Sequence, residues 1–117
     1  MKSPLTIESL PLWEPLMNFV RDIYTLTEYF PESERNGLSQ KLRNKVTDVP
    51  MTLAAALNGI STTGVSEALA ALAQTETLLI ICKHLKLATD ESVSDFQTKI
   101  RDLKSHITSL NNRLQKQ

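Results

Sequence analysis

Four basic residues near the middle of the chain are the first candidates for chemistry, because Lys and Arg side chains bind phosphate groups. Arg35 is followed by Lys41, Arg43 and Lys45 at alternate positions of an expected helix. Alternate positions lie about 200° apart on a helix, so Lys41 and Lys45 share a face and Arg43 points elsewhere. The whole chain has 13 basic and 13 acidic residues, hence no basic excess. We therefore favour a solvated surface over phosphate binding, and nucleic acid stays the second choice of partner.

A second set of basic residues lies outside the apolar seam of the last expected helix and is diluted by Asp95 and Asp102. It consists of Lys99, Arg101, Lys104 and Arg113. An ordinary charged surface is again the favoured interpretation, because acidic side chains reduce the attraction for phosphate.

The two histidines are His84 and His106, and Asp102 precedes His106 by one helical turn, a spacing that can hold a metal ion. Two ligands without a Glu-x-x-His motif elsewhere fall short of a di-metal bundle site. The chain also lacks a glycine-rich phosphate loop, a nucleophile with a convincing base and a pair of catalytic carboxylates. We expect no catalytic site, no cofactor and no metal.

Glu76 is the unusual polar residue, since it stands in an apolar seam between Leu72 and Leu79. A buried carboxylate is costly unless it is paired. The pattern predicts that Glu76 meets Arg43 or a backbone group and fixes the register of two helices. A functional carboxyl with a perturbed proton affinity is the less favoured alternative.

The elements that must position these residues are four helices. Apolar residues at helical spacing run from Leu12 to Phe30, ahead of Pro31. A second helix begins between Ser33 and Gly37 and runs to Asn58-Gly59. A third helix follows possible caps at 61–63, and a fourth is capped at 89–91. The short links predict an all-α fold, an antiparallel up-down four-helix bundle. Residues 12–117 form one domain, and residues 1–11 are a lead-in.

Pro50 interrupts the apolar period of the second helix. An interior proline removes one backbone hydrogen bond and clashes with the preceding turn. The unbroken period on both sides favours a single proline-kinked helix, and two helices meeting at 48–50 are the alternative.

Two helices carry more apolar surface than a single seam needs. The first has a second stripe, and the third, within ALAALAQTETLLIIC, is apolar on several sides. Deep burial within the bundle and contact with another subunit are both consistent with this surplus. The candidates for a subunit interface are Trp13, Met17, Val20, Tyr24, Leu78 and Cys82.

Cys82 is the one cysteine of the chain, and it also fits a core position as a small hydrophobic residue. No disulfide can form within the chain, which fits a reducing compartment. The N-terminal residues lack the pattern of a signal peptide, and no apolar run long enough to cross a bilayer is apparent. We expect a cytoplasmic protein without membrane contact.

Short motifs in a fixed order connect this chain to a known family. They are Leu12-Trp13, Tyr24-x-Leu26-Thr27, Phe30-Pro31, Glu34-x-x-Gly37-Leu38, Gln40-x-Leu42-Arg43, Val49-Pro50, and Leu72 with Glu76-Thr77. The series resembles the four-helix-bundle proteins encoded in intervening sequences of large-subunit rRNA genes, which are similar to the accessory variability proteins of diversity-generating retroelements. This resemblance implies a homopentamer, and for basic members of the family it implies nucleic-acid binding.

Departures from the family pattern reduce the charge of this chain. Asn44 stands where a second arginine is usual, and 51–56 replaces a Ser-Asn-Ile-Ala-Glu-Gly segment. Residues 60–64 replace a basic, serine-rich entry to the third helix. The sequence therefore predicts a homo-oligomeric scaffold or binding module that engages a protein partner.

Overall fold

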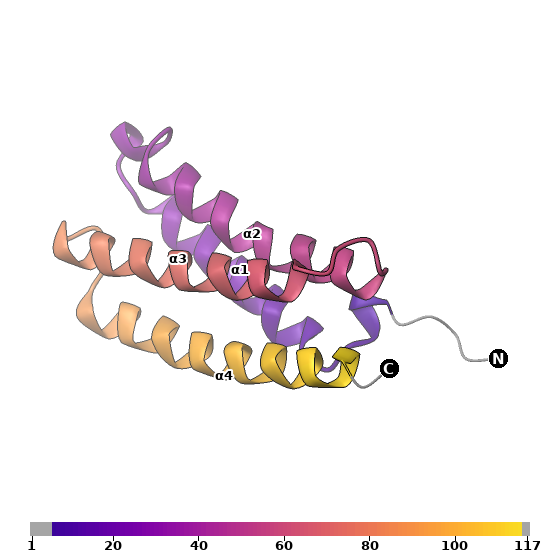
Figure 1. Cartoon of the computed structure of the whole chain (residues 1–117). Coiled ribbons are helices and arrows are strands. Elements are labelled where there is room, and N and C mark those ends of the chain that lie inside the picture. Colours follow the sequence, from indigo (N-terminus) through magenta and orange to yellow (C-terminus); the bar gives the residue numbers. More distant parts are fainter. Residues whose placement is uncertain (1–5, 116–117) are drawn as a thin grey trace.

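The computed structural model describes residues 6–115, which form four long helices and two short 3-10 turns. The long helices are α1 (Trp13–Glu28), α2 (Leu38–Leu57), α3 (Gly64–His84) and α4 (Asp90–Gln115), and the turns are η1 (Ile7–Ser9) and η2 (Glu32–Glu34). This part of the chain contains no strand, so the predicted all-α fold with four helices is confirmed. Successive helices run in alternate directions in Figure 1, with short connections between them.

Local side-chain and backbone hydrogen bonds fix where the helices begin. Glu34 Oε1 accepts a hydrogen bond from the backbone N–H of Leu38 (3.2 Å) at the start of α2. Thr89 Oγ1 accepts one from the N–H of Ser92 (3.0 Å), which confirms the predicted cap of α4. Thr63 precedes α3, but its hydroxyl bonds to Glu67 and makes no hydrogen bond to a backbone N–H at that end.

Helices α2 and α3 end in the same way, although only one of them ends with glycine. After α2, Ile60 N–H donates to the carbonyl oxygen of Ala55 (3.0 Å), and Gly59 has a φ of 71°. After α3, Leu87 N–H donates to the carbonyl oxygen of Cys82 (2.8 Å), and Lys86 has a φ of 65°. Both ends show the hydrogen-bond pattern of a Schellman motif. Glycine adopts the left-handed conformation without steric cost, whereas Lys86 does not.

Helix α2 passes through Pro50 as one helix of 20 residues. This finding supports a single helix over two helices that meet at 48–50. Val46 and Val49, on the N-terminal side of the proline, and Leu53 after it are all fully buried, so the same face stays on the core. The kink itself stays a prediction.

The core draws apolar side chains from all four helices and from the segment before α1. Leu10 and Leu12 are both buried in it, at 5% and 3% exposure. Leu10, within the predicted lead-in of residues 1–11, therefore packs with the core of the helices. The fully buried large side chains include Leu16, Phe19, Ile23, Leu42, Leu53, Leu72, Leu79 and Ile107.

The buried seam of α3 contains Thr75 where the predicted seam contains Glu76. Thr75 is fully buried there, and its hydroxyl donates to the carbonyl oxygen of Ala71 (2.8 Å). Its neighbour Glu76 is only half-buried. A threonine satisfies its polar group within its own helix, whereas a carboxylate cannot do so, and the helix is rotated accordingly.

Candidate functional site

Arg43 lies where the C-terminal part of α1 packs against α2. Its Nε donates a hydrogen bond to Thr27 Oγ1 (2.8 Å), and its guanidinium carbon lies 4.6 Å from the centre of the Tyr24 ring. The Thr27 hydroxyl in turn donates to the carbonyl oxygen of Tyr24 (2.9 Å). Arg43 thus stabilises the contact between two helices through a charge-assisted hydrogen bond and a cation–π contact. The three residues all belong to the motifs that suggested the family.

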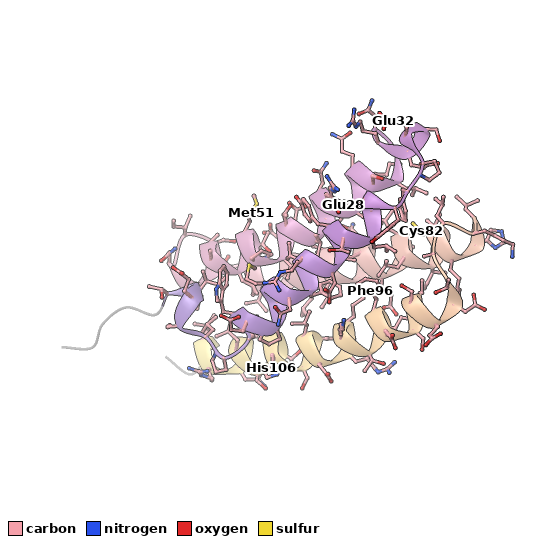
Figure 2. All side chains as sticks on the ribbon, turned by 180° about the vertical axis from the view of Figure 1, so that it is seen from behind. Glu28, Glu32, Met51, Cys82, Phe96 and His106 are labelled. Atoms are coloured by element: carbon pink, nitrogen blue, oxygen red, sulfur yellow. The ribbon has the colours of Figure 1, made fainter. Side chains whose placement is uncertain are left out.

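A groove of about 450 Å³ opens beside Arg43, between the end of α1 and the beginning of α2. Its lining includes charges of both signs, from Glu28 and Glu32 and from Arg35 and Arg43. Arg35 is also paired with Glu32 at 3.1 Å, in an exposed contact. Figure 2 shows Glu28 and Glu32 at this end of the molecule. Carboxylates beside the arginines weaken the attraction for a phosphate group.

The four predicted nucleic-acid residues do not come together. Arg35 and Arg43 line the groove between α1 and α2, whereas Lys41 and Lys45 line a separate groove between α2 and α3. The second groove measures about 510 Å³ and also contains Asp48. The basic residues are therefore spread over two surfaces, as the 200° argument predicts for alternate positions.

Glu76 has a different partner from the predicted one. Its Oε2 accepts a hydrogen bond from Gln97 Nε2 on α4 (3.2 Å). Arg43 bonds to Thr27 instead, so the predicted contact between Glu76 and Arg43 is wrong. Because Glu76 is half-buried and bonds to α4, it connects α3 to α4, and no hydrogen bond or ion pair among the described residues joins it to α2.

The second apolar stripe of α1 remains partly exposed. Trp13, Met17, Val20 and Tyr24 are all half-buried, and the last three pack against the edge of the core. Leu78 on α3 has the same intermediate position. These five candidates thus keep part of their surface available outside the protomer.

Cys82 lies in the core. It is 0% exposed, so the side chain has no surface to offer a second subunit, and we assign it to the core and not to an interface. Burial raises the pKa of the Cys82 thiol from 9.0 to about 11, and the negative charge of Glu34 adds to this effect. A thiol with so high a pKa is almost entirely protonated at neutral pH and reacts slowly.

Several exposed apolar residues were not singled out from the sequence. Tyr29 (84%), Ile60 (82%) and Met51 (64%) have the most exposed large apolar side chains of the described residues. Met51 and Ile60 stand in two segments that depart from the family pattern. That departure is the feature of the sequence that could have drawn attention to them. Tyr29 follows the last turn of α1, so the helical period does not predict whether its side chain faces the core or the solvent.

A groove of about 670 Å³ lies between α1 and α4. Lys99 Nζ donates to Asp22 Oδ2 across this seam (2.9 Å). Asp102 and His106 stand on its α4 side, where Figure 2 shows His106 pointing outward. No group of three or more His, Cys, Asp and Glu side chains within residues 6–115 could hold a metal ion.

Helix α3 is long and apolar enough, by length and composition, to cross a membrane. This differs from the expectation that no such run exists. Only 39% of its most apolar window is buried within the protomer. A core helix of a soluble protein meets the same criterion, so composition alone gives weak evidence for a membrane.

These features define a class of protein: a small helical bundle with mixed-charge grooves and partly exposed apolar surfaces. The sequence profile described as 23S rRNA-intervening sequence protein matches residues 8–109, and the chain belongs to this family. The resemblance to the rRNA intervening-sequence proteins drawn from the motifs is thereby confirmed. The match begins before Leu10, in agreement with the burial of that residue. A comparison with curated proteins gave no match.

Proposed function

We propose that the protein is a non-enzymatic, homo-oligomeric helical scaffold of the cytoplasm that presents repeated copies of one surface to a protein partner. One observation carries this proposal. Four large apolar side chains of α1 keep part of their surface exposed along more than three helical turns, Trp13, Met17, Val20 and Tyr24. Apolar surface in such a continuous stripe is typical of protein–protein contacts.

We infer that the exposed side chain of Met51 on α2 joins this surface. Met51 follows Arg43 by two helical turns, and Arg43 lies over Tyr24 of α1. We call these five residues, Trp13, Met17, Val20, Tyr24 and Met51, the α1–α2 apolar surface. It supports self-association, and the family resemblance favours five copies. The absence of a net charge also favours a protein partner over a polyanion.

Nucleic-acid binding is the alternative function. It is supported by the family and by the arginines of the groove between α1 and α2. Glu28 and Glu32 in the same groove oppose it. Binding of duplex DNA and structured RNA at several salt concentrations tests this alternative. Micromolar affinity that falls steeply with salt would replace the scaffold proposal.

Light scattering of the purified protein tests self-association directly. We expect a mass of several protomers for the wild type and a smaller mass for Met51→Glu, because a carboxylate on the α1–α2 apolar surface opposes its burial. Met51 is 64% exposed, so this variant should keep its fold, as circular dichroism would verify. Thr25→Glu on the exposed side of α1 is the matched control and should retain the wild-type mass. A monomeric wild type would overturn the proposal.

A further inference from the structure

A second apolar surface lies on the outer side of α3, away from the α1–α2 apolar surface. The core-facing positions of α3 include Ala68, Leu72, Thr75 and Leu79, and Glu76 is turned toward Gln97 of α4. The exposed apolar and small side chains of the opposite side are Ala70, Ala73, Thr77, Ile80, Ile81 and Leu85. We call these six residues the α3 outer surface. Ile80 and Ile81 are each 40% exposed and Leu85 is 54% exposed.

The α3 outer surface changes in size and charge along the helix. Its N-terminal half has the small side chains Ala70 and Ala73, and its C-terminal half has the bulky Ile80 and Ile81. Glu67 is exposed at the N-terminal end, whereas His84 and Lys86 are exposed at the C-terminal end, with Lys83 half-buried beside them. The exposed positions from Ala70 to Ile81 include no charged residue. One half of this surface is thus complementary to the other in both volume and charge.

We propose that a second copy of this chain docks on the α3 outer surface, with the two α3 helices antiparallel about a two-fold axis near Gln74 and Thr77. Around this axis Ala70 of each copy lies opposite Ile81 of the other. Glu67 lies opposite His84 in the same register, beside Lys83 and Lys86. A parallel pairing would instead place each residue against itself, with Ile81 on Ile81 and Glu67 on Glu67.

Three physical effects favour the antiparallel pairing. Bulky side chains fill the space above small ones, so the two helices approach closely. Opposite charges meet at both ends of the contact, which adds electrostatic complementarity. The two helix dipoles are also opposed, so the positive end of each lies beside the negative end of the other.

This inference rests on the proposed function only because both require self-association. The contact that it describes is on α3, whereas the proposed function uses α1 and α2. A two-fold contact is isologous, whereas a ring of five needs two different patches on each copy. If both surfaces are used, the assembly holds two rings back to back, with an even number of copies. Disruption of the α3 outer surface would then halve the mass and leave single rings intact.

The main experiment compares the same substitution at two exposed isoleucines. Ile81→Lys places a charge in the α3 outer surface, and Ile60→Lys places one at an 82% exposed residue outside it. By light scattering over a concentration series, we expect Ile81→Lys to weaken the two-fold contact at least about tenfold, the equivalent of 1.4 kcal/mol. Ile60→Lys should leave the contact unchanged. Thermal unfolding shows whether both variants keep their fold.

A charge exchange tests the direction of the pairing without changing the core. Glu67→Lys alone brings like charges together at both ends, and so does His84→Glu alone. Each should weaken association, and the double variant should restore it, because the two positions then again carry opposite charges. Loss of association in both single variants without restoration in the double variant would exclude the antiparallel register.

The outcomes separate this inference from the proposed function. A monomeric wild type overturns both. If the wild type and the variants Ile81→Lys and Glu67→Lys form oligomers of the same mass, only the proposed α3 contact is overturned. Flotation with phosphatidylcholine vesicles tests whether a lipid bilayer occupies this surface instead. If the wild type floats with vesicles and Ile81→Lys does not, the α3 outer surface binds lipid, and the two-fold contact is overturned.

Discussion

The two helix pairs α2–α3 and α1–α4 differ in how closely their backbones approach. At the start of α3, a Cβ atom added to Gly64 would lie 2.8 Å from Ala56 Cβ and still closer to the carbonyl oxygen of Thr52. Between α1 and α4, a groove of about 670 Å³ stays open. There the helices are connected by an edge-to-face contact between Phe19 and Phe96, with ring centres 5.9 Å apart, and by an ion pair at the surface. Figure 1 shows α2 and α3 side by side over much of their length.

The size of the facing side chains explains this difference. The last turn of α2 has Ala56, and the facing start of α3 has Gly64. Small residues permit close backbone approach, whereas phenylalanine rings hold α1 and α4 apart. The comparison indicates that α2 and α3 form the rigid half of the bundle, and that the α1–α4 seam adapts more easily to a change in side-chain volume.

The largest effect is expected where the backbones are closest. Gly64→Val should lower the free energy of unfolding by about 3 kcal/mol, because the new side chain overlaps backbone atoms that cannot move independently. Chemical denaturation measures this loss. Ser105→Val adds similar bulk at the rim of the open α1–α4 groove and should change stability by less than about 0.5 kcal/mol. Equal losses in the two variants would show that the seams do not differ in tolerance.

The buried thiol of Cys82 gives the rigid half a specific dependence on pH. The pKa of Cys82 is about 11 in the folded protein against 9.0 for the free group, so the unfolded chain loses the proton first. The associated stability is complete below about pH 9 and is lost as the pH rises through about 11. Two pKa units correspond to roughly 3 kcal/mol. The difference in unfolding free energy between wild type and Cys82→Ala, followed from neutral to alkaline pH, measures this contribution, and a constant difference would contradict it.

The smallest effect is expected at the ion pair across the open seam. Asp22 and Lys99 are 40% and 50% exposed, so water and salt screen their attraction. Asp22→Asn and Lys99→Gln should each reduce stability by less than about 0.5 kcal/mol, and added salt should reduce the difference further. A double-mutant cycle in denaturant isolates the pair. A coupling energy well above about 1 kcal/mol would mean that the α1–α4 seam is more tightly held than its groove suggests.

Much of the fold follows from local patterns along the chain. Pro31 and Gly59 mark the ends of the first two long helices, and Thr89 caps the last one, as the sequence predicts. The ordered motifs were sufficient for the family, which the match over residues 8–109 confirms. Such signals depend on the backbone preferences of single residues and their close neighbours, so no tertiary contact is needed to interpret them.

The candidate site was predicted less well, because its contacts join different helices. The contact of Arg43 with Tyr24 and Thr27 was not predicted, although all three residues stood in recognised motifs. A motif shows that residues occur together in a family, but not which of them touch. The partner of Glu76 was wrong for the same reason, since either neighbouring helix could have supplied it.

The sequence by itself determined four helices, their ends and the family. The tertiary structure decided that Thr75 and not Glu76 faces the core, that Leu10 joins the domain, and which apolar residues remain exposed. The physical reason is clearest in α3. Its apolar residues surround the axis, so helical periodicity gives no preferred direction, and only close packing against α2 and α4 sets its rotation. One step along a helix turns it by 100°, which is enough to exchange a core position for a surface one.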